Sequence, residues 1–260
     1  MGILDSLFGL LFGRRRRAEP PVRTAPPRTA PQMEAPRAPP PLSPAPEVAP
    51  PQFPTTPAGH FFDTLIAETT SPLTPADFVA SAQRLGCEPA VIRAYFQVET
   101  GGRSGFEADG KTTILYEPHI FSQRTQRRYD GSHPNISYPR WDRTRYPRDQ
   151  AGRWAQMREA FALDPEAAVA SASWGAFQVM GFHYQRCGFP TAQAFVADMS
   201  KSMARQLAAF EAYVLHDRVL TQAVRDKNWR VMTERYNGSG QVDVYAPRLE
   251  AAYRRYAAEA

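Results

Sequence analysis

The chain has 260 residues, enough for one or two domains, and its prolines show which part of it can fold. Fifteen of the 25 prolines lie between residues 18 and 58. Proline removes backbone donors and fixes φ, and this stretch has almost no periodic apolar residues, so we predict an extended, solvated spacer over 18–58. Residues 60–260 are then the folded domain, which is long enough to bury a core without metals or disulfides.

The net charge of +5 lies mainly outside that domain. Residues 1–58 hold seven arginines against four acidic residues, which leaves +3 there and +2 on the rest of the chain. A nearly neutral folded domain argues against nucleic-acid binding, which favours a basic stripe interleaved with aromatic residues. A mildly cationic protein is still attracted to anionic bacterial envelopes.

Residues 1–17 form an apolar segment that is followed at once by four arginines. The apolar positions follow helical spacing, and they are Ile3, Leu4, Leu7, Phe8 and Leu11. The run is too short to span a bilayer, and a secretory signal would place its charges before the apolar run rather than after it. We therefore predict an amphipathic segment that associates with an anionic membrane surface. The alternative is a disordered start that binds another partner or none. With no export signal evident, the compartment is not determined.

The predicted helices of the domain are marked by their ends. Thr74 and the proline after it are typical of a capped helix start, and Gly86 ends that helix. Pro89 begins a second helix with an apolar stripe, which stops at a glycine pair beginning with Gly101. Glu99 therefore lies at the carboxyl end of a helix, beside a glycine turn.

Further along, one short strand is predicted among helices. Thr112 to Tyr116 is β-branched and apolar. After a polar, proline-marked loop, helix starts are expected at Asp164 and Thr191, with a long helix near 197–216 and a last one near 243–258. The sequence thus predicts a mainly α domain with one small β element.

Glu99 is the candidate for acid chemistry. It follows directly on an apolar stripe, and partial desolvation of a carboxyl group raises its pKa. A carboxylic acid that stays protonated near neutral pH can give its proton to a glycosidic oxygen. Taken alone, however, a glutamate at a helix end is usually a solvated surface residue.

Two later segments place polar groups where packing alone would not ask for them. In the first, Ser173, Gly175 and Gln178 interrupt an apolar run. Gly175 suggests a close backbone approach by substrate or a neighbouring strand, and Gln178 offers an amide suited to amino sugars or to buried backbone groups. In the second, Tyr236 and Asn237 precede Gly-Ser-Gly, where they form a groove wall or a simple turn.

Together the three segments resemble a known superfamily. The order Glu-Ser/Thr, Gly-x-x-Gln and Tyr-Asn-x-Gly is similar to that of goose-type lysozymes and lytic transglycosylases. More closely, V-E-T-x-G, I-L-Y-E-x-H-I-F, S-A-S-W-G-A-F-Q-V-M-G-F and R-Y-N-G resemble the N-acetylmuramidase domain of phage endolysins over about residues 74–256. Where family members commonly show E-S-x-G and F-E-R-H, this chain has Thr100 after Glu99 and Tyr116-Glu117-Pro118-His119.

The resemblance implies a mainly α, α+β lysozyme-like fold, which is a helical bundle with one small β element flanking a substrate cleft. It also implies an enzyme that cuts the β-1,4 bond between N-acetylmuramic acid and N-acetylglucosamine in peptidoglycan. Glu99 would be the general acid, and the substrate-binding residues would be Ser173, Gly175, Gln178, Tyr236 and Asn237. Hydrolysis needs a second carboxylate, for which Glu117 is the first choice and Asp109 the second. Without one, the muramyl hydroxyl could attack instead and give a lytic transglycosylase with an anhydro product.

Other classes of function stay open at this level. His183 and Cys187 stand at i, i+4, and His119 is near Glu117, as in a zinc amidase or peptidase, but a full ligand set is absent. We expect no metal, no cofactor, no nucleic acid and a monomer. Cys87 and Cys187 are expected to be free thiols, with a single disulfide between them as the alternative. A non-catalytic wall-binding or virion structural protein is the remaining alternative.

Overall fold

The computed structural model describes residues 58–259. The predicted amphipathic segment 1–17 lies outside the described residues, as does the spacer 18–58 apart from its last residue. No helix in 58–259 combines the length and apolarity that crossing a membrane requires.

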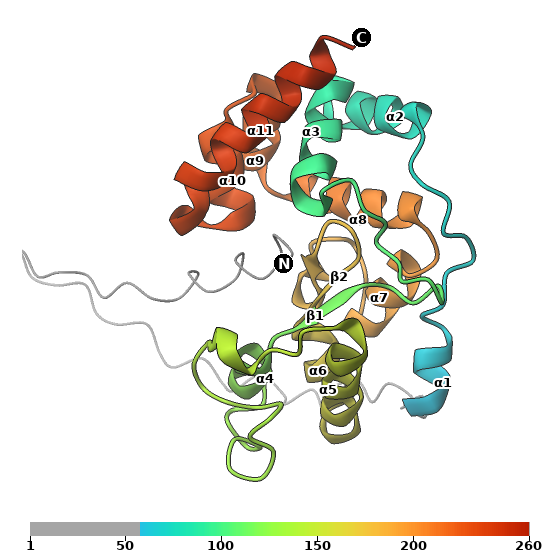
Figure 1. The fold of residues 1–260 in the computed structure, drawn as a ribbon, viewed down its shortest axis with the longest axis vertical. Coiled ribbons are helices and arrows are strands. Elements are labelled where there is room, and N and C mark those ends of the chain that lie inside the picture. The colour runs from blue at the N-terminus through green and yellow to red at the C-terminus, as the bar shows by residue number, and fades with distance from the viewer. Residues whose placement is uncertain (1–57, 260) are drawn as a thin grey trace, which may run out of the picture. The chain divides into compact units, whose positions relative to one another are not determined.

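Helices make up most of the domain (Figure 1). The α-helices are α1 Ala58–Asp63, α2 Pro75–Leu85, α3 Pro89–Thr100, α4 Pro118–Arg124, α5 Gln150–Leu163, α6 Pro165–Ala170, α7 Ala192–Met199, α8 Met203–His216, α9 Arg218–Asp226, α10 Trp229–Asn237 and α11 Val242–Ala257. The domain also has short 3-10 helices, which are η2 Arg143–Arg145, η3 Gly181–His183 and η4 Ser239–Gln241.

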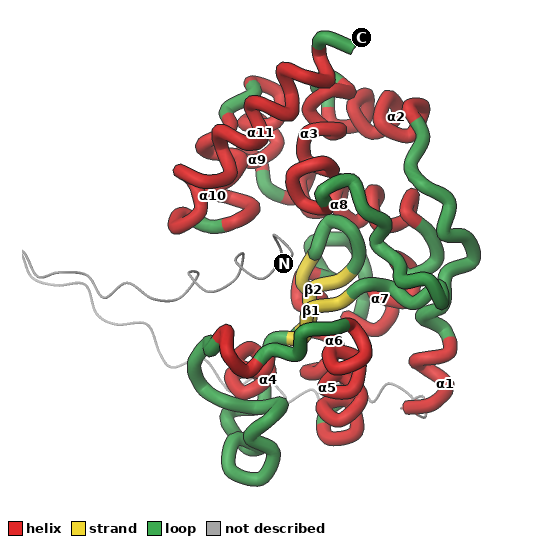
Figure 2. The backbone as a smooth tube through the Cα atoms, in the orientation of Figure 1, coloured by secondary structure: helices red, strands yellow, loops and turns green. Residues whose placement is uncertain are grey.

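A small antiparallel sheet lies among these helices (Figure 2). Its strands are β1 Ile114–Tyr116, β2 Ala172–Trp174 and β3 Val179–Met180, in the order β1-β2-β3. Leu115 faces Ser173 across β1 and β2, and Ser173 faces Met180 across β2 and β3. The single predicted strand is therefore one of three, and the fold is the mainly α, α+β arrangement that the sequence predicts.

The helix that carries Glu99 is held by neighbours from both ends of the domain. Helix α3 packs against α2 before it and against α11 at the far end of the chain. In Figure 1, α3 and α9–α11 lie on one side of the sheet, and α4–α6 lie on the other. The buried core runs through both groups, with the rings of Tyr95, Phe210 and Phe177 close together near α3.

The predicted helix ends agree with the structure except at the start of the predicted long helix. Thr74 forms a capping box with Asp77, and Gly86 closes α2 at φ 72°. Asp164 and Thr191 cap α6 and α7 through their side chains. The predicted long helix over 197–216 is wrong at its start, because α7 ends at Met199. The helix is interrupted there. Helix α8 then begins at Met203, and Ser202 caps its start by accepting a hydrogen bond from Arg205 N at 3.2 Å.

Candidate active site

Glu99 is the penultimate residue of α3, and the local sequence ends the helix immediately after it. Gly101 adopts a left-handed conformation at φ 63°, which glycine reaches without steric cost. Thr100 stabilises the same end, since its Oγ1 donates to Phe96 O at 2.6 Å and accepts from Gly102 N at 2.8 Å. The carboxyl group is thus held on a rigid helix end, and Glu99 is only 2% exposed.

Burial makes the Glu99 carboxyl group a weak acid. Removal from water raises the pKa of Glu99 to about 7, and a hydrogen bond from Asn237 opposes this rise. In that bond, Asn237 Nδ2 donates to Glu99 Oε1 at 3.0 Å. Burial of the ring, together with the negative charge of an ionised Glu99, raises the pKa of Tyr245 to about 12. The surroundings of Glu99 therefore favour its neutral form up to neutral pH.

Asn237 reaches Glu99 from the last position of α10, 138 residues further along the chain. Its other amide atom, Oδ1, is buried and has no hydrogen-bond partner among the residues the structure describes. An amide both donates and accepts, so this side chain can donate to an ionised carboxylate or accept from a protonated carboxyl group. Asn237 is therefore suited to either protonation state of Glu99.

A cleft of about 1090 Å³ opens beside this helix end. It is lined by Thr100, Arg103, Ser104, Phe106, Glu107, Thr113, Leu115, Glu117, Trp141, Arg143, Thr144, Tyr146, Pro147, Arg148, Gln150, Arg153, Gly175 and Ala176. Glu99 itself is not among the lining residues, but its neighbour Thr100 is. The cleft is thus bounded by the turn after α3, the strand β1, the loop before α5 and the turn between β2 and β3.

Glu117 directly follows β1 and lines this cleft with a fully buried side chain. It occupies the position before α4 without capping that helix through its side chain. Instead, Glu117 Oε2 accepts a hydrogen bond from Tyr146, and His119 Nδ1 lies 3.3 Å from the same oxygen. Glu117 Oε1 has no hydrogen-bond partner within residues 58–259. One carboxylate oxygen is thus held in place, while the other is buried at the wall of the cleft without a hydrogen-bond partner among the described residues.

Tyr146 and His119 were not predicted as site residues. Tyr146 lies 29 residues from Glu117, in a loop whose sequence shows only arginines, prolines and aromatic residues. His119 follows Glu117 by two positions, and that adjacency was the only available signal. The alternative carboxylate, Asp109, is exposed and does not line the cleft. It accepts hydrogen bonds from the backbone N and from the side chain of Lys111.

The polar side chains of Ser173 and Gln178 form hydrogen bonds within their own segment rather than pointing into the cleft with free polar groups. Ser173 Oγ donates to Gln178 Oε1 at 2.7 Å, and Gln178 Nε2 donates to Gly175 O at 2.7 Å. Ser173 lies in β2, and Gly175 and Gln178 lie in the turn between β2 and β3, where Gly175 has φ +69°. A Cβ at Gly175 would lie 2.5 Å from Gln206 Cδ, so only glycine fits between the cleft and α8. Of these three predicted binding residues, Gly175 lines the cleft.

Tyr236 is likewise held by the protein. Its hydroxyl donates to Phe177 O at 2.7 Å, and its ring packs edge-on against Tyr95 and Tyr213. The last helical turn of α10 is thereby tied to the β2–β3 turn and to α3. Of the predicted residues, the structure brings Glu99, Asn237 and Tyr236 together on one side, and Glu117 and Gly175 along the cleft.

The residues considered for zinc do not form a site in the described part of the chain. No group of three or more His, Cys, Asp or Glu side chains within 58–259 could hold a metal ion. His183 packs edge-on against Phe182 and Tyr213, and burial lowers its pKa to about 3. Cys87 and Cys187 are both free, and Cys187 donates weakly to Ala209 O. The pairing of the two cysteines as a disulfide is absent from this structure.

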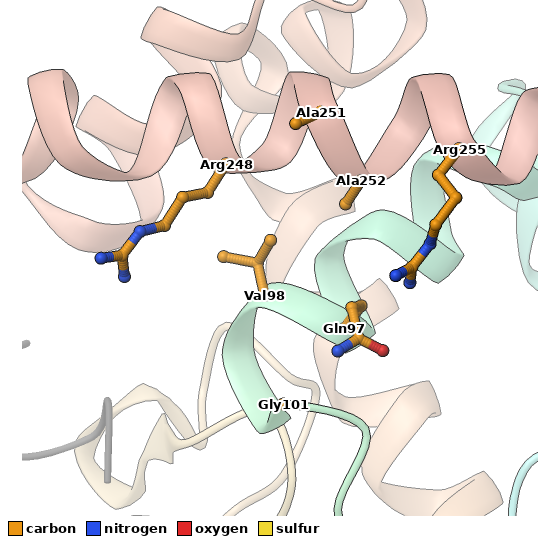
Figure 3. A pocket seen from close by; sticks show the side chains of 7 residues that line it. All are labelled: Gln97, Val98, Gly101, Arg248, Ala251, Ala252 and Arg255. Carbon is orange, nitrogen blue, oxygen red and sulfur yellow. The ribbon is translucent and has the colours of Figure 1, made fainter. Parts of the chain in front are cut away.

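A second, smaller hollow of about 370 Å³ lies between α3 and α11 (Figure 3). Its lining residues are Gln97, Val98, Gly101, Arg248, Ala251, Ala252 and Arg255. Figure 3 shows Arg248 and Arg255 extending from α11 on either side of Val98. Because Thr100 belongs to the large cleft and Gly101 to this hollow, the turn after Glu99 separates the two.

Comparison with known proteins identifies this arrangement. A family model described as N-acetylmuramidase matches residues 88–257. The crystal structure of the endolysin of Burkholderia phage AP3 is similar, with 37% sequence identity, 72% of each chain covered and a TM-score of 0.66. No curated protein sequence matches the chain. The match covers well over half of the chain, so the protein belongs to the N-acetylmuramidase family and is a glycoside hydrolase that acts on peptidoglycan.

Proposed function

We propose that this enzyme hydrolyses the β-1,4 bond between N-acetylmuramic acid and N-acetylglucosamine, with Glu99 as the general acid. The observation that carries the proposal is the buried Glu99 carboxyl group, whose pKa of about 7 keeps it protonated in slightly acidic and neutral solution. Only the protonated form can supply a proton to a leaving sugar oxygen.

In the proposed reaction the two carboxyl groups have different tasks. Glu99 gives its proton to the glycosidic oxygen as the bond from that oxygen to C1 of the muramyl sugar breaks. Glu117 takes a proton from the attacking water or offsets the positive charge that develops at C1. Its unpartnered Oε1 is the atom suited to that step, while Tyr146 holds Oε2.

The remaining predicted binding residues support this site in different ways. Gly175 lines the cleft, so a sugar can approach the backbone there closely. Ser173, Gln178 and Tyr236 use their polar groups inside the protein, and we propose that they keep the β2–β3 turn and α10 in position. Their direct contact with the sugar stays a prediction.

Analysis of the products tests the bond and the attacking group together. Purified peptidoglycan is digested with the full chain, and the released muropeptides are analysed by mass spectrometry with and without prior borohydride reduction. We expect reducible muramic acid ends, because water is the proposed nucleophile. Anhydro ends, lighter by one water and resistant to reduction, would show attack by the muramyl hydroxyl and a lytic transglycosylase. Reducible glucosamine ends, or cleaved peptides, would contradict the proposed bond.

The pH dependence of the reaction follows from the protonation of Glu99. Its pKa of about 7 predicts that kcat/KM falls as the pH rises through that value, because the acid is lost. Asn237→Ala removes the hydrogen bond that lowers the pKa of Glu99, so the alkaline limb should move to higher pH. Initial rates on labelled peptidoglycan at constant ionic strength would measure the alkaline limb of the unaltered chain and that of the variant. An unchanged limb in the variant would separate Asn237 from the titration of the acid.

A further inference from the structure

The large cleft has cationic side chains that the proposed reaction does not use. Arg103 lies just after α3, and Arg143 and Arg148 lie in the loop before α5. All three are exposed and line the cleft. None of them has a carboxylate within ion-pair distance in the described part of the chain. Arg103 Nε donates only to Thr100 O, at 3.2 Å.

The acidic residues beside these arginines are engaged elsewhere. Asp142 accepts from Thr144 N at 3.0 Å and caps η2. Asp149 accepts from Gly152 N at 2.8 Å and caps α5. Both carboxylates thus bond to backbone at helix starts, so the loop leaves Arg143 and Arg148 uncompensated.

The fold holds this loop firmly against the sheet. Gln150, the first residue of α5, bonds to both backbone groups of Ile114 in β1, at 3.0 and 3.1 Å. Tyr146, between the two arginines, donates to Glu117. Trp141 begins the same loop, is 36% exposed and lines the cleft with its ring 6.5 Å from that of Tyr146. An exposed indole offers a flat apolar face for a sugar ring, and the arginines line the same cleft.

We infer that Arg143 and Arg148, aided by Arg103, recognise free carboxylates on the stem peptides of peptidoglycan. This inference rests on the proposed function and specifies its substrate as peptide-bearing, anionic glycan strands. A muramyl sugar carries its peptide on a lactyl ether, so a strand bound in the cleft brings the carboxylates of its stem peptides close to the arginines that line it. Guanidinium groups bind carboxylates with paired, directional hydrogen bonds, and uncompensated ones lose no existing partner when they do so.

The test compares one substrate in two charge states. Soluble, uncross-linked glycan strands are used directly or after their carboxylates have been coupled to methylamine with a carbodiimide. We expect the full chain to cleave the carboxylate form with a kcat/KM about tenfold higher, since two exposed ion pairs together contribute about that factor. In the double variant Arg143→Gln, Arg148→Gln this ratio should fall close to one.

Arg127→Gln, Arg218→Gln is the matched control. Both residues are exposed and lie outside the cleft, and their guanidinium groups have no hydrogen bond or ion pair within residues 58–259, so the same net charge is removed and the ratio should persist. The ratio should also decline as salt is raised to about 1 M, where the screening length is about 3 Å.

Two results would overturn the inference. Equal cleavage of both substrates by the unaltered chain would show that carboxylates are not recognised, and an undiminished ratio in the cleft variant would show that these arginines are not the receptors. In both cases the strands are still cut, so the proposed function stands. Failure to cut either substrate would instead contradict the proposed function.

Discussion

Glu99→Gln should lower kcat on peptidoglycan by about a thousandfold or more, within the range that loss of general acid catalysis covers. Glutamine keeps the shape of the side chain and its hydrogen bonding with Asn237, but it has no proton to give to the leaving oxygen. Release of dye-labelled fragments from peptidoglycan measures the loss. Activity near that of the unaltered chain would remove Glu99 from the mechanism.

The same variant should be more stable than the unaltered chain above neutral pH, which shows that inactivity is not unfolding. The pKa of Glu99 is about 7 when folded and 4.5 ordinarily, so the folded state holds its proton more tightly. Stability from this group is fully present below pH 4.5 and is lost as the pH rises through 7. At about 1.4 kcal/mol per pKa unit, the loss approaches roughly 3 kcal/mol above pH 7. Glutamine stays neutral, so thermal unfolding curves should coincide at low pH and diverge above neutrality.

Glu117→Gln should give the second largest loss, about a hundredfold or more in kcat with little change in KM. The amide fills the same buried space beside Tyr146 but cannot take a proton from water or offset positive charge. Tyr146→Phe should cause a smaller loss in kcat, because it frees Oε2 of Glu117 without removing the carboxylate. Single-turnover rates on soluble glycan strands separate kcat from KM in both variants.

Glu107→Gln is the matched control for that prediction. Glu107 also lines the cleft, but no hydrogen bond or ion pair joins its side chain to the rest of the described chain, so the same charge is removed without altering the proposed mechanism. Equal losses in Glu107→Gln and Glu117→Gln would indicate a general effect of cleft charge. Full activity in Glu117→Gln would show that a second carboxylate is not required, and anhydro products would then be expected.

Local sequence determined the bounds of α3, the helix that carries Glu99, and those of α2 before it. Pro89 and Gly101 delimit α3, and Thr74 with Gly86 delimit α2, because capping and left-handed glycine depend on a few adjacent residues. The position of Glu99 beside a glycine turn follows from these signals alone. The family motifs likewise pointed to an N-acetylmuramidase, and the comparisons confirm the family.

Short strands and helix breaks were harder to predict, because their stability comes from partners elsewhere. Strands β2 and β3 have three and two residues, too few to show a period of two, and they exist because β1 pairs with β2. The break between Met199 and Met203 interrupts an apolar helical pattern. A serine cap at Ser202 restarts the helix there, and serine is compatible with either a cap or a helix interior.

The chemistry of the site was decided by tertiary structure. Burial of Glu99, its bond to Asn237 from α10 and the grip of Tyr146 on Glu117 join residues 138 and 29 positions apart. A pKa depends on the water and charge around a group, and those come from segments that meet only in the folded chain. Sequence could name the two glutamates, whereas only folding buries the carboxyl group of Glu99 and leaves Oε1 of Glu117, at the wall of the cleft, without a hydrogen-bond partner among the described residues.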